Sequence, residues 1–437
     1  MKPPKPQHVF EPQLLSRLGL YLERSLNFHI DKDGAKFSSN GPDIGLLARL
    51  DHMVSLSLET SLAPFVIEEV MRPAWVVAEN VFDPQNSACL PTYFKRASPN
   101  RWSPNTEKLG LLLARDLHAL WSLDPASPAA KQLLYAPHLQ LLVEMFFRHP
   151  VQKCRGQNIS LHFRNTERLE ADVYNDFVAQ FRQAMLARKL LRRERHNWSL
   201  GSRENVENLR AYLDDLFTRH HSLTVLHLRL FHARERINLI TAPVDEQHQD
   251  LQALRACRAK FFDRMRRKPA LFTDAPGYVW AVLPSLEGGY DLHLTLLVDT
   301  ASLRGVLDDK RAEAEQIGAA LEDYSDQVGG YWVTGGTGGR GGYIRGDRSP
   351  GLYGPDWVHG EVCADDPVRR KKLRETLDYL ALRRVLVRLK NEPSGAYFGM
   401  PDREARPSRR LAKRGAQERE SSADTAKHTR QNSIQYA

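Results

Sequence analysis

The sequence predicts an α/β protein of the α+β type, in which helices cover an antiparallel sheet and a mainly helical N-terminal region precedes it. The stretch 289–299 alternates strictly between apolar and polar residues, which is typical of a strand with one buried face. Two further stretches with a period of two residues, 221–231 and 277–283, flank a helical pattern, and glycines at 288 and 289 predict a hairpin turn between the last two strands. The order strand, helix, strand, strand therefore favours an antiparallel sheet.

Composition and charge limit the classes of function that this chain can have. A chain of 437 residues with 42% hydrophobic residues is long enough for two or three domains with real cores, and it is not a disordered chain. Its formal net charge of +9 indicates a polyanionic partner, with nucleic acid the first candidate and an anionic membrane surface the second.

Features of membrane or secreted proteins are missing from the sequence. No apolar run approaches the roughly 20 residues that a membrane helix needs, and the start Met1–Pro6 lacks the apolar core of a signal peptide. We therefore expect a cytoplasmic protein without a membrane partner.

Residues 1–200 are interpreted as a mainly helical region. Leucines at helical spacing and capping signals predict four helices, over residues 12–28, 43–62, 106–121 and 138–147. The stretch 72–105 is rich in Pro, Asn and Ser, so we interpret it as irregular structure between helices. No chemical motif occurs in the first 150 residues, and the role of residues 1–200 stays open.

A dense basic segment, residues 188–196, ends the predicted helix 165–195, and a second helix is predicted over 203–219. In a nucleic-acid-binding protein such a segment contacts phosphates and adds affinity that does not depend on base sequence. A solvated helical face is at least as common for a run of charges of this kind. Both interpretations stay open.

The strand at 289–299 carries two candidate metal ligands. Leucines and a valine occupy the face that we expect to be buried, while Asp291, His293 and Thr295 occupy the other face, which we expect to be open to solvent. A carboxylate and an imidazole two residues apart on a strand can reach one Mg²⁺ or Mn²⁺ ion. The alternative is that Asp291 follows a glycine turn and His293 lies on a solvated surface.

Two more segments of this half carry chemistry. The glycine-rich stretch 329–343 is interpreted as a flexible loop whose backbone N–H groups could contact a nucleic-acid backbone, since it lacks the Lys-Ser/Thr ending of a nucleotide-binding loop. A helix starting near Asp366 places Lys372, Tyr379 and Arg383 on one face. A phenol between cations can attack a phosphodiester, whereas a plain surface tyrosine is the commoner case.

Residues of about 220–400 resemble the gene-two replication proteins of filamentous phages and their prophages, the inoviruses. The resemblance rests on five segments in order, 225–231, 277–280, 288–294, 331–343 and 379–383. The segment 288–294 is similar to the histidine–hydrophobe–histidine (HUH) strand of that family, and 379–383 to its tyrosine helix. The chain has Asp291 where the family has its first histidine, and Arg383 where a lysine often follows the tyrosine.

The resemblance implies a replication-initiator domain over residues 215–400, which binds single-stranded or origin DNA and works with host replication proteins. It implies metal-dependent nicking and joining of one strand, with Asp291 and His293 holding Mg²⁺ or Mn²⁺, Tyr379 as nucleophile, and Arg383 and Lys372 steadying the phosphate. The competing function is a non-enzymatic DNA-binding or regulatory module of the same fold. An RNA-binding sheet is less favoured because no stacking-aromatic signature occurs at the expected positions. Residues 401–437 are basic and polar, and we expect them to be disordered.

Overall fold

The computed structural model describes most of the chain between residues 28 and 401. The described ranges are 28–30, 36–38, 44–72, 92–126 and 133–401, less short gaps at 157, 165, 236, 238–241, 285–288, 319, 321 and 350–356. Residues 1–399 form one compact unit and residues 400–437 a second. The predicted helix at 12–28 and, beyond its first residue, the predicted tail at 401–437 lie outside the described residues.

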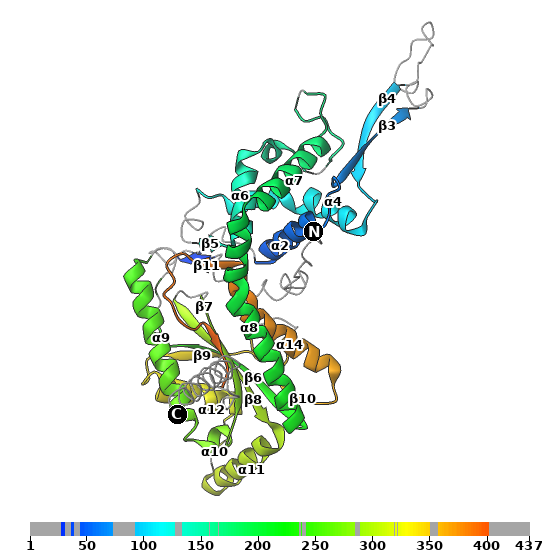
Figure 1. Ribbon diagram of the computed structural model, residues 1–437. Helices are drawn as coiled ribbons and strands as arrows, with labels where there is room; N and C mark the ends of the chain where they lie inside the picture. Colours follow the sequence, from blue (N-terminus) through cyan, green and yellow to red (C-terminus); the bar gives the residue numbers. More distant parts are fainter. Residues whose placement is uncertain are drawn as a thin grey trace, which may run out of the picture. The chain divides into compact units, whose positions relative to one another are not determined.

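The largest sheet of the first unit has six antiparallel strands and lies between helix α9 (Val244–Met265) and helices α8 (Lys189–Arg219) and α14 (Pro367–Leu382) (Figure 1). Five strands follow the order β10-β6-β8-β7-β12, and β9 also pairs with β6. The bounds are Ser222–Phe231 for β6, Gly277–Pro284 for β7, Tyr290–Asp299 for β8, Gly342–Arg345 for β9, Gly360–Cys363 for β10 and Phe398–Gly399 for β12. The predicted mixed architecture with an antiparallel sheet is confirmed. The strand with the clearest alternation, β8, lies between β6 and β7.

The apolar face of the sheet packs against helices that follow β6 and β8 in the chain. Helix α9 (Val244–Met265) is the helical pattern predicted between β6 and β7, and its Phe262 ring stacks on Tyr278 of β7 with centroids 4.4 Å apart. The short helix α10 (Pro269–Phe272) follows it. Helices α11 (Thr300–Ile317) and α12 (Tyr324–Tyr331) follow β8. Gly318 ends α11 in the left-handed conformation, φ 66°, which a glycine adopts without strain.

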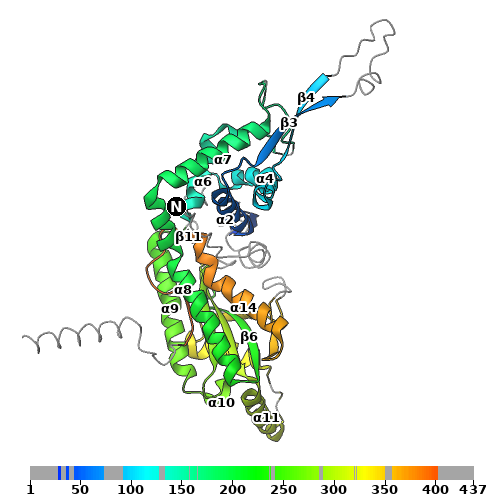
Figure 2. The ribbon, with the colours of Figure 1, turned by 45° about the vertical axis from the view of Figure 1, so that its right-hand side comes forward.

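The opposite face is covered by two long helices, α8 (Lys189–Arg219) and α14 (Pro367–Leu382), which lie side by side (Figures 1 and 2). Arg210 of α8 and Asp378 of α14 join them through an ion pair of 2.7 Å. At Gly277 a side chain would meet the backbone carbonyl of Leu297 at 2.9 Å and the Tyr212 hydroxyl of α8 at 3.0 Å. The glycine therefore lets α8 approach the sheet closely.

The helices predicted at 165–195 and 203–219 are divided differently. Helix α7 (Glu170–Ala187) ends before Arg188, and α8 then continues for 31 residues. Its buried residues recur along almost its full length, from Leu191 to Phe217, so packing of one side keeps the helix continuous through Gly201. Helix α8 also passes through the predicted boundary between the N-terminal region and the domain at 215–400.

The N-terminal region combines helices with β-structure, so the prediction of a mainly helical region is corrected. Helices α2 (Ile44–Glu59), α4 (Pro104–Asp116) and α6 (Pro137–Arg148) agree with prediction, and short 3-10 helices follow α4, α6 and α14 at Leu117–Leu123, Pro150–Lys153 and Arg383–Val385. The stretch interpreted as irregular instead contributes a hairpin of β3 (Phe65–Arg72) and β4 (Thr92–Pro99). Two further strand pairs occur, β1 (Phe28–Ile30) with β2 (Lys36–Ser38) and β5 (Leu133–Tyr135) with β11 (Val387–Leu389).

Side chains from distant parts of the chain hold this hairpin. The Asn175 amide of α7 accepts from the backbone N–H of Phe65 and donates to its carbonyl, both at 3.0 Å. The Ser160 hydroxyl accepts from the N–H of Ala97 at 2.9 Å. Within the described ranges, no helix is both long and apolar enough to cross a membrane.

Candidate functional site

Asp291, His293 and Thr295 lie in a row on β8, on the face that α8 and α14 cover. All three are buried, with exposed fractions of 0%, 5% and 1%. The expectation that this face is open to solvent is therefore wrong. The alternation correctly separates polar from apolar residues, but β8 is an inner strand and helices cover both faces of the sheet.

Arg229 of β6 provides the partner of Asp291. It stands directly opposite His293 in the antiparallel register, and its Nε–H donates to the Asp291 carboxylate. Arg229 and Asp291 form an ion pair with exposed fractions of 3% and 0%. Sequence reasoning assigned no role to Arg229. The available signal was the alternation of β6, which places Arg229 on the same strand face as His227.

His293 is neutral over the ordinary pH range. Burial lowers its pKa to about 3, and the positive charges of Arg229 and Arg383 act in the same direction, whereas Asp291 acts against them. A neutral imidazole is the form that can bind a metal ion. The same two arginines, however, place positive charge where a cation would have to bind.

His227 extends the buried polar row on β6, where it pairs with Thr295 in the register. Its Nε2 lies 3.0 Å from the carbonyl oxygen of Val358 and its Nδ1 lies 2.7 Å from the Thr295 hydroxyl. A carbonyl only accepts, so Nε2 carries the proton and Nδ1 accepts from Thr295. Burial, with His359 nearby, holds the His227 pKa well below its usual value. This histidine therefore has a structural hydrogen-bonding role.

Helix α14 brings two of its three predicted site residues to this buried region. Asp366 caps the helix by accepting from the N–H groups of Val368 and Arg369, as expected. Tyr379 is 0% exposed and Arg383, just after the helix, is 2% exposed. Lys372, predicted on the same face of the helix as Tyr379, is exposed. It lies in the first part of α14, where only Leu373 is buried, whereas the helix is buried all round from Thr376 to Leu382.

The donor set can be tested against the predicted metal. Within the described ranges, no group of three or more His, Cys, Asp and Glu side chains is arranged to hold a metal ion. The Asp291 carboxylate accepts from Arg229. In this conformation the pair Asp291 and His293 does not fit Mg²⁺ or Mn²⁺, which need several oxygen ligands free of competing cations. The metal site stays a prediction.

The glycine-rich stretch 329–343 has a different structure from the flexible loop that we expected. It contains the end of α12, a π-helical turn at Trp332–Gly336 and β9. The buried Trp332 donates from its indole nitrogen to the carbonyl of Phe231 at 3.0 Å. A side chain at Gly341 would come within 2.3 Å of that carbonyl oxygen. At this position, close packing accounts for the glycine.

The basic segment 188–196 begins helix α8. Its side chains at Arg188, Lys189, Arg192 and Arg193 are exposed. Arg195 instead turns inward, 3.6 Å from the Asp51 carboxylate. In the described part of the chain no acidic side chain forms an ion pair with the four exposed cations, which leaves them available to an anionic ligand.

We compared the chain with models of protein families, with curated proteins and with solved structures, and none of the three comparisons gave a match.

Proposed function

We propose that the protein binds DNA through the basic segment and that its six-stranded domain acts without catalysis, as a binding or regulatory module. The observation that carries the proposal is a contrast in exposure. The cations of the basic segment are exposed, whereas Tyr379 and Asp291 are fully buried. The resemblance to inovirus replication proteins suggests the setting, which is replication of a phage, prophage or other mobile element.

Burial of Tyr379 argues against strand cleavage in this conformation. A nucleophile must come within about 3–3.5 Å of the reacting phosphorus to attack it. A DNA backbone cannot reach a phenol with no exposed surface unless α14 moves. Asp291 is likewise unavailable because Arg229 already binds it.

The salt dependence of DNA affinity tests the binding proposal. Each phosphate contact to single-stranded DNA contributes about −0.7 to the slope of log affinity against log salt. If Arg192 and Arg193 each contact one phosphate, the double variant Arg192→Gln/Arg193→Gln should have a slope that is shallower by about 1.4. The slopes are obtained from fluorescence anisotropy of a labelled oligonucleotide.

Arg266 and Arg267 provide the matched control. They are also consecutive and exposed, but they lie at the C-terminal end of α9, outside the basic segment. Arg266→Gln/Arg267→Gln should keep the wild-type slope. Equal slopes for wild type and the Arg192/Arg193 variant, or no DNA binding at low salt, would contradict the proposal.

The nicking enzyme is the second candidate, and one observation favours it. Arg383, next to the helix that carries Tyr379, lies close enough to His293 to lower its pKa. The helix with the predicted nucleophile, the predicted phosphate-binding cation and the predicted metal ligand thus lie on one face of the sheet. Outward movement of α14 would uncover them together. Calorimetric titration with Mn²⁺ distinguishes the two functions. If the protein is the nicking enzyme, the wild type should bind Mn²⁺ and His293→Ala should not. We expect that neither the wild type nor His293→Ala binds Mn²⁺.

A further inference from the structure

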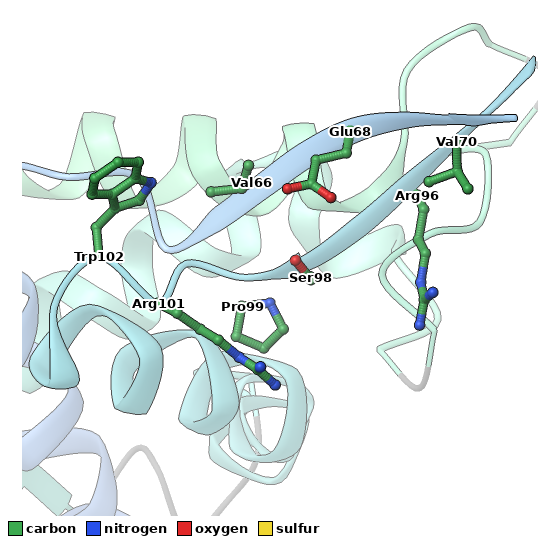
Figure 3. A pocket seen from close by; sticks show the side chains of 8 residues that line it. All are labelled: Val66, Glu68, Val70, Arg96, Ser98, Pro99, Arg101 and Trp102. Atoms are coloured by element: carbon green, nitrogen blue, oxygen red, sulfur yellow. The ribbon is translucent and has the colours of Figure 1, made fainter.

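The β3–β4 hairpin carries a pocket of about 660 Å³ on one of its faces (Figure 3). Val66 and Val70 of β3, with Pro99 of β4, give it apolar walls. Trp102 stands at one end, and the side chain of Arg96 lies toward the other (Figure 3). Its volume falls within the roughly 300–1,000 Å³ of small-molecule sites.

The backbone of Trp102 is held in place, and its ring is exposed. The indole is 85% exposed, a larger fraction than for any other large apolar side chain among the described residues. Its backbone N–H donates to the Asn100 side chain at 3.1 Å, and the Asn100 amide donates to the carbonyl of Ala63 at 2.8 Å. Asn100 is buried, so the tryptophan stands on a fixed turn. A positioned, exposed aromatic ring is a typical stacking surface for an unpaired base.

The charged groups of the pocket complement a nucleic-acid strand. Arg96 and Arg101 provide two guanidinium groups. Arg101 shares an ion pair of 3.2 Å with Glu107, but its side chain is largely exposed, so this pair is weak. Glu68 stands opposite Arg96 in the register on the same face. A carboxylate there can accept from the amino group of a base, as Glu does from cytosine, and it would repel an acidic peptide.

We propose that this pocket binds single-stranded DNA, with one base stacked on Trp102 and flanking phosphates at Arg96 and Arg101. The inference rests on the proposed DNA-binding function and adds a second contact region, distinct from the basic segment. Bases within a duplex are already stacked on their neighbours, so they cannot lie on the indole. The pocket therefore gives the full-length protein a preference for single strands.

Substitution of Trp102 tests this directly. Stacking on an aromatic side chain contributes enough that its removal should weaken single-strand affinity by roughly 5- to 150-fold. Trp102→Ala should show this loss with a labelled oligonucleotide, while affinity for the matching duplex stays unchanged. Trp102→Phe should recover most of the affinity because it restores a ring. Arg96→Gln should make the single-strand salt slope shallower by about 0.7.

Trp121 is the matched control, since it is an exposed tryptophan, 49%, that does not line the pocket. Trp121→Ala should bind both DNAs as the wild type does. Wild-type affinity in Trp102→Ala, an equal loss for the duplex, or tighter binding of the corresponding RNA would overturn the inference. If the wild type binds no DNA at all, the proposed function itself is contradicted. Failure of the pocket inference and failure of the proposed function are therefore distinguishable.

Discussion

The ion pair between Arg229 and Asp291 is buried in the sheet face that α8 and α14 cover. Removal of one partner of such a pair leaves an uncompensated buried charge and typically costs about 3–5 kcal/mol. Asp291→Ala should therefore lower the free energy of unfolding by an amount of this order. The double variant Arg229→Met/Asp291→Leu, which leaves no charge, should recover most of it. Urea denaturation measures the stability of both variants. If Asp291→Ala is as stable as the wild type, the ion pair does not have this structural role.

His293 makes the fold sensitive to acid. Its pKa is lowered from 6.5 to about 3 in the folded protein, mainly by burial. Between these values the unfolded chain binds the proton and the folded chain does not, so stability is lost as the pH falls through this window. One such group contributes a slope of about 1.4 kcal/mol per pH unit.

Denaturation at a series of pH values in this window measures that slope. His293→Gln should reduce the slope of the free energy of unfolding against pH by close to the contribution of one proton. His227 and other buried histidines should keep their contributions to that slope. An unchanged dependence in the variant would show that His293 titrates normally.

At the level of elements, α8 packs against α14, the helix that carries the buried Tyr379. Arg210 is the partner of Asp378, whose pKa burial raises. Arg210→Ala would leave this buried carboxylate without its partner and should loosen α14. Faster hydrogen exchange of the α14 amides, with easier chemical nitration of Tyr379, is the expected result.

Arg219→Ala is the control for this experiment, because it breaks an exposed ion pair with Asp215 inside α8. It should leave exchange in α14 unchanged. Equal exchange in wild type and Arg210→Ala would mean that the pair does not hold α14 in place.

Local patterns predicted the elements whose own periodicity decides them, and missed those that depend on distant contacts. The alternation of β8 and the leucine spacing of α2 are visible in the sequence. The β3–β4 hairpin depends on Asn175 and Ser160, which are far away in the chain, so no local pattern reveals it. The continuity of α8 likewise follows from the packing of its buried side.

For the molecule as a whole, the sequence placed Asp291 and His293 correctly on one face but did not predict what covers it. Alternation separates the two faces of a strand, whereas burial of the polar face depends on two helices from elsewhere in the chain, α8 and α14. The cross-strand arginine that binds Asp291 could be found only once the register of β6 and β8 was known. In the structure both residues belong to a buried polar core, and the metal centre stays a prediction.

The most direct test of the proposed non-catalytic DNA binding is a search for a covalent intermediate. Full-length protein is incubated with labelled single-stranded DNA and Mn²⁺, and each sample is divided between a native and a denaturing gel. We predict a salt-sensitive complex on the native gel and no labelled protein on the denaturing gel. A labelled band that survives denaturation in the wild type and is absent from Tyr379→Phe would contradict this account and establish Tyr379 as the nucleophile.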